Sequence, residues 1–135
     1  MAHTDFTQQH RAIGRTAAWA VFFLGILYAV ITGLGLRSLK SPQDPISDPF
    51  FFFMELLIVL MTPLMVISMI AVHAYASPQV KAYSFTALVF MVLLAGISSS
   101  IHFVILSVSR QIEFDELPGL SLFFSFKWPS VVYAL

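Results

Sequence analysis

The sequence contains no cysteine. This absence excludes disulfides, thiolate-ligated metal sites, iron–sulfur clusters, catalytic thiols and palmitoylation. Charge is also scarce, because only 10% of the 135 residues are charged, whereas a typical soluble domain has about 25%. Seven basic and seven acidic residues give a net charge of zero. With no basic surplus to neutralise phosphates, nucleic acid is not an expected partner.

Apolar side chains are what the sequence has in excess, at 59% of the residues. So few charges cannot cover a water-exposed surface, so we expect the lipid bilayer to surround the chain. A helix needs about 20 apolar residues to cross the hydrocarbon core, and the segments 16–36, 50–76 and 83–109 meet this requirement. The first follows Arg11 and Arg15 but is longer than the roughly 7–15 apolar residues of a signal peptide, so we expect an uncleaved span.

These segments predict an all-α integral membrane fold. We expect an antiparallel bundle of three complete transmembrane helices, forming a single membrane domain over residues 1–135. Residues 118–128 are apolar and end in Lys127-Trp128, residue types typical of a membrane interface. Pro129 suits the first position of a helix. We therefore predict a fourth span beginning near Pro129, as in the N-terminal part of a longer protein, or alternatively an interfacial helix at this end.

Basic residues set the orientation of membrane proteins, and here they are evenly divided. One side of the predicted membrane carries Arg11, Arg15 and Lys81, and the other carries Arg37, Lys40 and Arg110. The acidic residues of the loops 37–49 and 110–117 favour the second side as the outer one. We therefore expect a cytoplasmic N-terminus in a cytoplasmic (plasma) membrane.

Three ionisable residues fall within the predicted spans: Glu55, His73 and His102. Glu55 is about 13 Å and His102 about 9 Å from the bilayer centre, both toward the 37–49 loop, so the two side chains could meet. Such a pair could act as acid and base or relay a proton, with Ser98 orienting the imidazole. The favoured alternative places Glu55 among the headgroups and leaves His102 bonded to Ser98 or to a backbone carbonyl.

Helical spacing predicts which faces pack together. At 100° per residue, Glu55, Thr62, Val66, Met69 and His73 share one face of the second span. One face of the third span carries Ser84, Met91, Ala95, Ser98, His102 and Ser109. On the first span, Gly25, Ala29 and Gly33 form a ridge of small residues, which is typical of close helix packing. We therefore expect a compact bundle.

The series Met61, Met65, Met69 and His73 recurs every four residues along one helix. Thioethers suit Cu(I), so these residues are metal-ligand candidates. Methionine as an apolar filler is the favoured interpretation, because there is no second methionine stripe. His73 and His102 lie about 23 Å apart along the membrane normal, too far to share a haem iron. We expect no cofactor.

Three classes of function remain open. The favoured class is a non-catalytic membrane subunit or scaffold with other membrane subunits as partners, because no complete active site is visible. The first alternative is a small transporter or proton-coupled carrier that uses Glu55 and His102. The second is a membrane enzyme in which the same pair serves as acid and base on a lipid-soluble substrate, and an enzyme is the less favoured reading.

Overall fold

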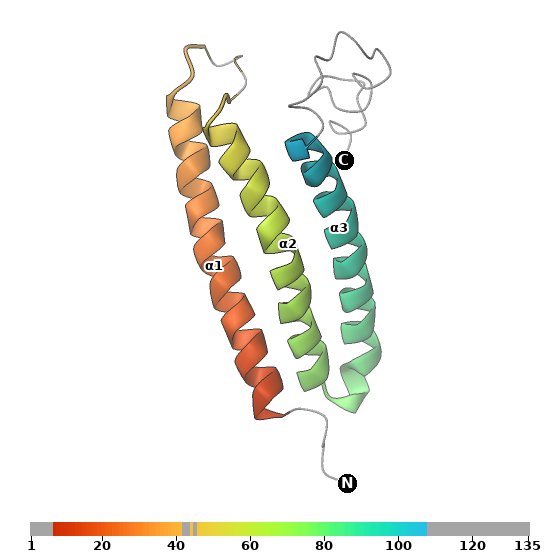
Figure 1. Ribbon diagram of the computed structural model, residues 1–135. Helices are drawn as coiled ribbons and strands as arrows, with labels where there is room; N and C mark the ends of the chain where they lie inside the picture. The colour runs from red at the N-terminus through yellow and green to blue at the C-terminus, as the bar shows by residue number, and fades with distance from the viewer. Residues whose placement is uncertain (1–6, 42–43, 45, 108–135) are drawn as a thin grey trace.

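The computed structural model describes residues 7–41, 44 and 46–107, and three long helices account for most of them. Helix α1 spans Gln8–Arg37, α2 spans Phe50–Tyr75 and α3 spans Lys81–Ser107, with a short 3-10 helix, η1, at Pro78–Val80. Consecutive long helices run in opposite directions (Figure 1). The predicted fourth span at Pro129, the interfacial segment 118–128 and the loop 110–117 lie outside the described residues.

In the described residues, α2 and α3 cover the second and third predicted segments to within two residues, and the predicted end of the third, residues 108–109, lies outside the described part. Helix α1 begins at Gln8, eight residues before the first predicted segment, 16–36. Thr7 caps this helix: its hydroxyl accepts from the backbone N–H of His10 at 3.3 Å, and Nδ1 of His10 accepts from the backbone N–H of Thr7 at 3.3 Å. Hydropathy marks only the part of a helix suited to lipid, whereas this cap starts the helix about two turns earlier.

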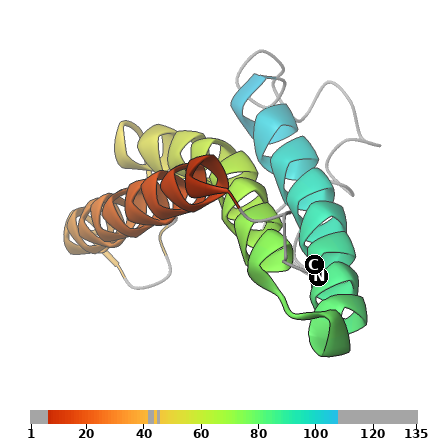
Figure 2. The same ribbon diagram turned by 90° about the horizontal axis from the view of Figure 1, so that it is seen from below.

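Helix α2 lies between the other two helices, as Figure 2 shows from the end. It packs against α1 on one side and α3 on the other, whereas the described parts of α1 and α3 have no comparable packing with each other. The helices therefore form a row rather than the compact bundle expected from the sequence. The contact faces predicted for α2 and α3 are confirmed in their described residues, since Glu55, Thr62 and Ala95 are buried.

Helix α1 packs on α2 through two glycines that are not part of the predicted small-residue ridge. Gly14 and Gly35 are both buried. A Cβ added to Gly14 would overlap the Cβ of Ala71 in α2. One added to Gly35 would come 2.8 Å from a methyl group of Ile46, in the loop before α2, and 3.3 Å from the Cβ of Phe50, the first residue of α2. At these two points the α1 backbone itself is the contact surface.

The predicted ridge of Gly25, Ala29 and Gly33 was wrong as a packing face. A Cβ at Gly25 or Gly33 would meet nothing within 4 Å, and Ala29 is exposed. Gly33 lies two residues before Gly35 and therefore about 160° from it around the helix. Helix α1 is apolar around most of its circumference, so polarity does not specify which face it turns toward α2.

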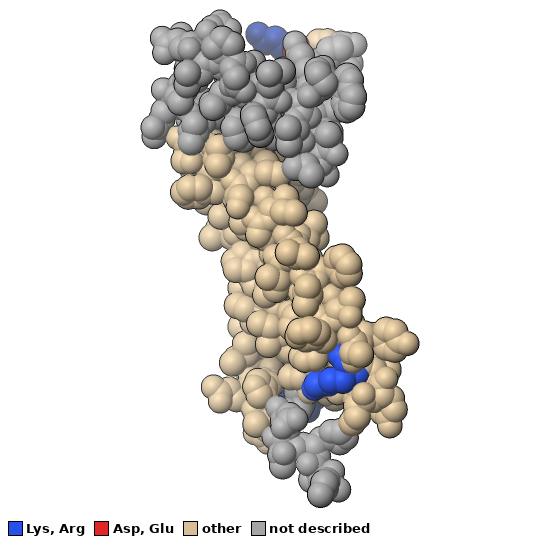
Figure 3. All heavy atoms as spheres, turned by 90° about the vertical axis from the view of Figure 1, so that its right-hand side faces the viewer, with Lys and Arg blue, Asp and Glu red and all other residues tan. Residues whose placement is uncertain are grey.

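The outside of the described structure is apolar. Large side chains such as Phe22, Phe23, Phe90 and Phe103 are each more than half exposed. Figure 3 shows basic side chains toward the two ends of the molecule and none in view between them. All three helices are long enough and apolar enough to cross a membrane. A surface of this kind fits lipid as the surrounding solvent.

Candidate functional site

Glu55 and His102 lie at the same level on neighbouring helices. Glu55 is in the second turn of α2, about 11 Å from the helix midpoint. His102 is near the end of α3, about 12 Å from that helix's midpoint. Because α2 and α3 run in opposite directions, both residues lie toward the end at which α2 begins and α3 ends (Figure 1).

The two side chains are hydrogen-bonded across the helix interface. Nδ1 of His102 lies 2.5 Å from Oε2 of Glu55. Glu55 is only 5% exposed, while the side chain of His102 retains 23% of its surface. The structure therefore contains the Glu55–His102 contact, which is one of the two alternatives predicted from the sequence. The other alternative placed Glu55 in a solvated position, but in the structure Glu55 is buried. Ser98 shares the face of His102, but no hydrogen bond joins the two within the described residues.

Burial makes the carboxyl group of Glu55 depend on its partner. The other buried polar residue in the described structure, Thr62, donates its hydroxyl to the carbonyl of Ile58 in its own helix, at 2.5 Å. Glu55 instead takes its partner from α3. One turn beyond His102, Ile105 is 2% exposed. An isolated carboxylate in such surroundings would lose several kcal/mol of hydration, which the imidazole partly offsets.

The pair can hold one proton in two ways without changing its total charge. It is either a carboxylate beside an imidazolium or a carboxylic acid beside a neutral imidazole, and the same hydrogen bond serves both forms. Since Nδ1 is engaged by Glu55, the second ring nitrogen, Nε2, is the atom from which a proton would pass onward. Within the described residues no hydrogen bond reaches Nε2. The arrangement is therefore chemically suited to proton exchange.

His73 belongs to a second polar contact, at the other end of the α2–α3 interface. Its Nδ1 lies 2.9 Å from the hydroxyl oxygen of Ser84. That hydroxyl is also 2.9 Å from the carbonyl of Lys81, to which it donates, so it accepts from His73. The Lys81 ammonium group in turn donates to the carbonyl of His73 at 3.0 Å. These three hydrogen bonds fasten the tight turn between the helices.

Sequence reasoning treated His73 as an isolated interfacial residue and missed this contact. A usable signal was present, because His73 and Ser84 stand on the two predicted contact faces, on either side of a short connection. The spacing of facing residues across such a turn places them at about the same level.

The methionine series Met61, Met65 and Met69 was considered above as a set of Cu(I) ligands. Met61 and Met69 are half-buried and Met65 is exposed on α2. No cluster of three or more His, Cys, Asp or Glu side chains that could hold a metal ion occurs in the described part of the chain. Nδ1 of His73, the fourth member of the series, is already engaged by Ser84.

No protein-family model, curated protein or solved structure matches this chain. Among the described residues, the Glu55–His102 pair is the most unusual feature.

Proposed function

We propose that the chain is an integral membrane protein in which the Glu55–His102 pair binds and releases a proton, as the proton site of a small transporter that carries protons across the bilayer. Its three long helices cross the bilayer in alternating directions, with the N-terminus on the cytoplasmic side. The observation that carries the proposal is the buried carboxylate of α2 bonded to the imidazole of α3 at 2.5 Å.

The cost of the pair supports a functional role. Placing an acidic residue within a membrane helix is unfavourable, by up to about 2.5–3.5 kcal/mol at the helix centre on insertion scales and by less toward the interface, where this pair lies. Two apolar side chains could join α2 to α3 without that cost. Glutamate and histidine are also among the residue types that relay protons within membrane proteins.

The depth of the pair gives it access to water on one side. The hydrocarbon core extends about 15 Å on either side of the bilayer centre. At about 11–12 Å from the helix midpoints, the pair would lie roughly 3 Å inside the edge of this core. A proton could therefore reach Nε2 of His102 from the side of the 37–49 loop.

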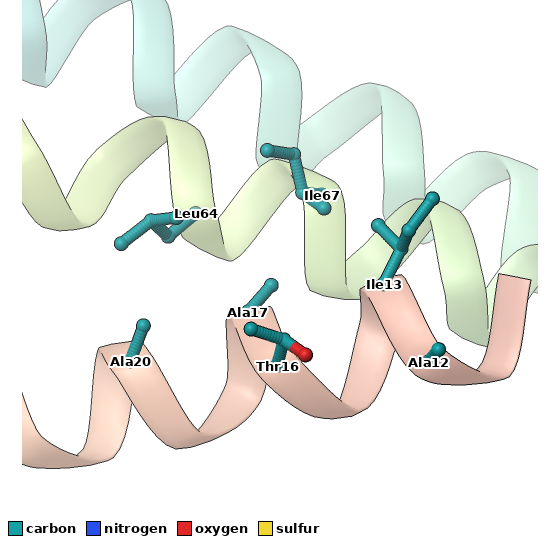
Figure 4. A pocket seen from close by; sticks show the side chains of 7 residues that line it. All are labelled: Ala12, Ile13, Thr16, Ala17, Ala20, Leu64 and Ile67. Carbon is teal, nitrogen blue, oxygen red and sulfur yellow. The ribbon is translucent and has the colours of Figure 1, made fainter. Parts of the chain in front are cut away.

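A second candidate function is a non-catalytic membrane subunit in which the pair only fastens α2 to α3. One observation favours it: the hydrogen bond between His102 and Glu55 joins α3 to α2, which is all that a fastening contact requires. Two grooves in the described part of the structure lie elsewhere, one between α1 and α2 (Figure 4) and the other at the turn around η1.

Proton flux into liposomes separates the two candidates. The protein is reconstituted with a pH-sensitive dye inside, and a potassium diffusion potential drives protons inward. We expect flux above that of protein-free liposomes, and we expect Glu55→Gln and His102→Gln to abolish it. The matched substitutions Asp48→Asn and His73→Gln, made outside the pair, should preserve it.

The proton-carrier proposal fails if wild-type flux equals that of protein-free liposomes. It also fails if Glu55→Gln conducts as well as the wild type. In either case, a loss of stability in Glu55→Gln would leave the fastening role as the remaining function of the pair.

A further inference from the structure

Ser98 carries a half-buried hydroxyl that has no hydrogen-bond partner among the described residues. Hydroxyls in membrane helices commonly donate to a carbonyl of the preceding turn, and those of Ser68, Thr86 and Ser100 do so at 2.7–3.0 Å. No described side-chain oxygen is both fully buried and without a partner, so the oxygen of Ser98 keeps accessible surface at which a water molecule can bind. Its hydroxyl is therefore available to a partner outside its own helix.

Ser98 lies beside the Glu55–His102 pair, on the face of α3 that packs against α2. It precedes His102 by one turn, about 6 Å along the helix, and lies within about 40° of it around the axis. Side chains of a helix lean toward its N-terminus, so the imidazole of His102 leans toward Ser98. Nδ1 of that ring is bonded to Glu55, which leaves Nε2 for exchange with a group near Ser98.

Thr62 supplies a second hydroxyl on the facing helix. It follows Glu55 by seven residues and so lies within about 20° of it around α2, and it is only 7% exposed. Its hydroxyl donates to the carbonyl of Ile58 at 2.5 Å, so its oxygen is still able to accept a hydrogen bond. Measured from the helix midpoints, Ser98 lies about 6 Å and Thr62 about 1 Å from the bilayer centre, both toward the end that carries the pair.

The axial steps between these polar groups match the reach of single water molecules. The step from His102 to Ser98 is about 6 Å, and the step from Ser98 to Thr62 is about 5 Å. A water that accepts one hydrogen bond and donates another spans about 5.6 Å, since each O–H···O bond is about 2.8 Å long. Beyond Thr62 the same face of α2 continues with the apolar side chains of Val66 and Met69, so this polar series ends near the bilayer centre.

We propose that the hydroxyls of Ser98 and Thr62 hold water molecules that carry a proton between the Glu55–His102 pair and the bilayer centre. This inference rests on the proposed proton function and adds two positioning residues to it. When Nε2 releases its proton, the electron pair stays on the imidazole and a lone pair of the first water accepts the proton. That water passes one of its other protons to the next water, near Thr62, so no bond within either hydroxyl group is broken.

The liposome flux assay tests the hydroxyl of Ser98. Ser98→Ala should lower the proton flux about tenfold, as expected when one hydrogen-bonded step of the transfer is lost. Ser98→Thr should restore most of the flux, because it keeps a hydroxyl at this position. The matched control is Ser100→Ala, which removes an exposed hydroxyl that is bonded within α3 and should leave the flux unchanged.

The hydroxyl of Thr62 is tested in the same way. Thr62→Val removes it with little change in the size of the side chain, and we expect a loss of flux similar to that in Ser98→Ala. Thr62→Ser should keep most of the flux. The matched control is Thr86→Val, because the hydroxyl of Thr86 is exposed on α3 and donates to the carbonyl of Ala82.

Nuclear magnetic resonance of serine-labelled protein in bilayers detects the water itself. Polarisation is transferred from water to carbon, and the signal of Ser98 is assigned by its loss in Ser98→Ala. We expect rapid transfer to Ser98 and little to Ser100, although Ser100 is the more exposed of the two. The Nδ1 signal of His102 should be the same in the wild type and Ser98→Ala, because the pair itself does not depend on this hydroxyl.

Three results would overturn the proposal. They are an absence of water transfer to Ser98, wild-type flux in Ser98→Ala, and a changed His102 signal in Ser98→Ala, which would assign Ser98 to the stability of the pair. Each leaves the proton function standing as long as the wild type conducts protons and Glu55→Gln does not. Wild-type flux at the level of protein-free liposomes would instead overturn both the proton function and this extension of it.

Discussion

Gly14→Ala should weaken the packing of α1 on α2. The added Cβ would overlap the Cβ of Ala71, which is a rigid group on the facing helix. Adding a methyl group to a well-packed contact costs typically about 1–3 kcal/mol. The matched control is Gly33→Ala on the same helix, where the new Cβ would meet nothing within 4 Å. Both changes alter helix propensity equally, so the difference between them isolates the clash.

The assay is reversible unfolding in mixed micelles with increasing dodecyl sulfate, monitored by tryptophan fluorescence. We expect Gly14→Ala to be less stable than Gly33→Ala by about 1–3 kcal/mol. Ala71→Gly should restore most of the loss in the Gly14→Ala background, because it removes the other half of the clash. Equal stability of the two single variants would refute the contact. A larger loss in Gly33→Ala would instead show that the small-residue ridge is a packing face.

Three further results are expected. In a double-mutant cycle, Glu55→Ala and His102→Ala should show a coupling free energy of about 1 kcal/mol in the same unfolding assay. Interhelical hydrogen bonds in membranes contribute about 0.6 kcal/mol on average and up to about 1.7 kcal/mol. Additive effects of the two substitutions would contradict the hydrogen bond between these residues. Thr7→Ala should cost about 1 kcal/mol and speed hydrogen exchange in the first turn of α1, and unchanged protection would contradict the capping role. Ser84→Ala should cost about 0.5–1.5 kcal/mol and shift the nitrogen resonances of His73, whereas an unmoved His73 signal would contradict their hydrogen bond.

The Glu55–His102 contact was within reach of the sequence. Ionisable residues are rare in membrane spans, so each one is conspicuous. The fixed rise of a helix then places residues on neighbouring spans at the same or different levels. The helical rise predicts that Glu55 and His102 lie at similar levels along the membrane normal and that His73 lies at a different level. It could not decide whether the side chains would meet, because that depends on how far each helix rotates about its axis.

The packing of α1 was beyond the reach of the sequence. Glycine or alanine occurs at positions 12, 14, 17, 18, 20, 25, 29, 33 and 35 of this helix, and spacing alone does not identify those that face α2. A helix that is apolar on most sides has no polar face to orient it. The choice of Gly14 and Gly35 depends on the shape of the partner at Ala71 and Ile46, which only the three-dimensional structure supplies.

The measurement that tests the proton site most directly is nitrogen NMR of the His102 imidazole in histidine-labelled protein in lipid bilayers. The signal is assigned by its loss in His102→Gln. In the wild type, we expect Nδ1 to show the shift of a nitrogen whose proton is shared with a carboxyl group, and we expect that proton to exchange with water as the pH is varied. Glu55→Gln should move the signal to that of an ordinary imidazole, while Asp48→Asn should leave it in place. A His102 signal that is identical in the wild type and Glu55→Gln, or one that does not respond to pH, would contradict a proton-binding pair.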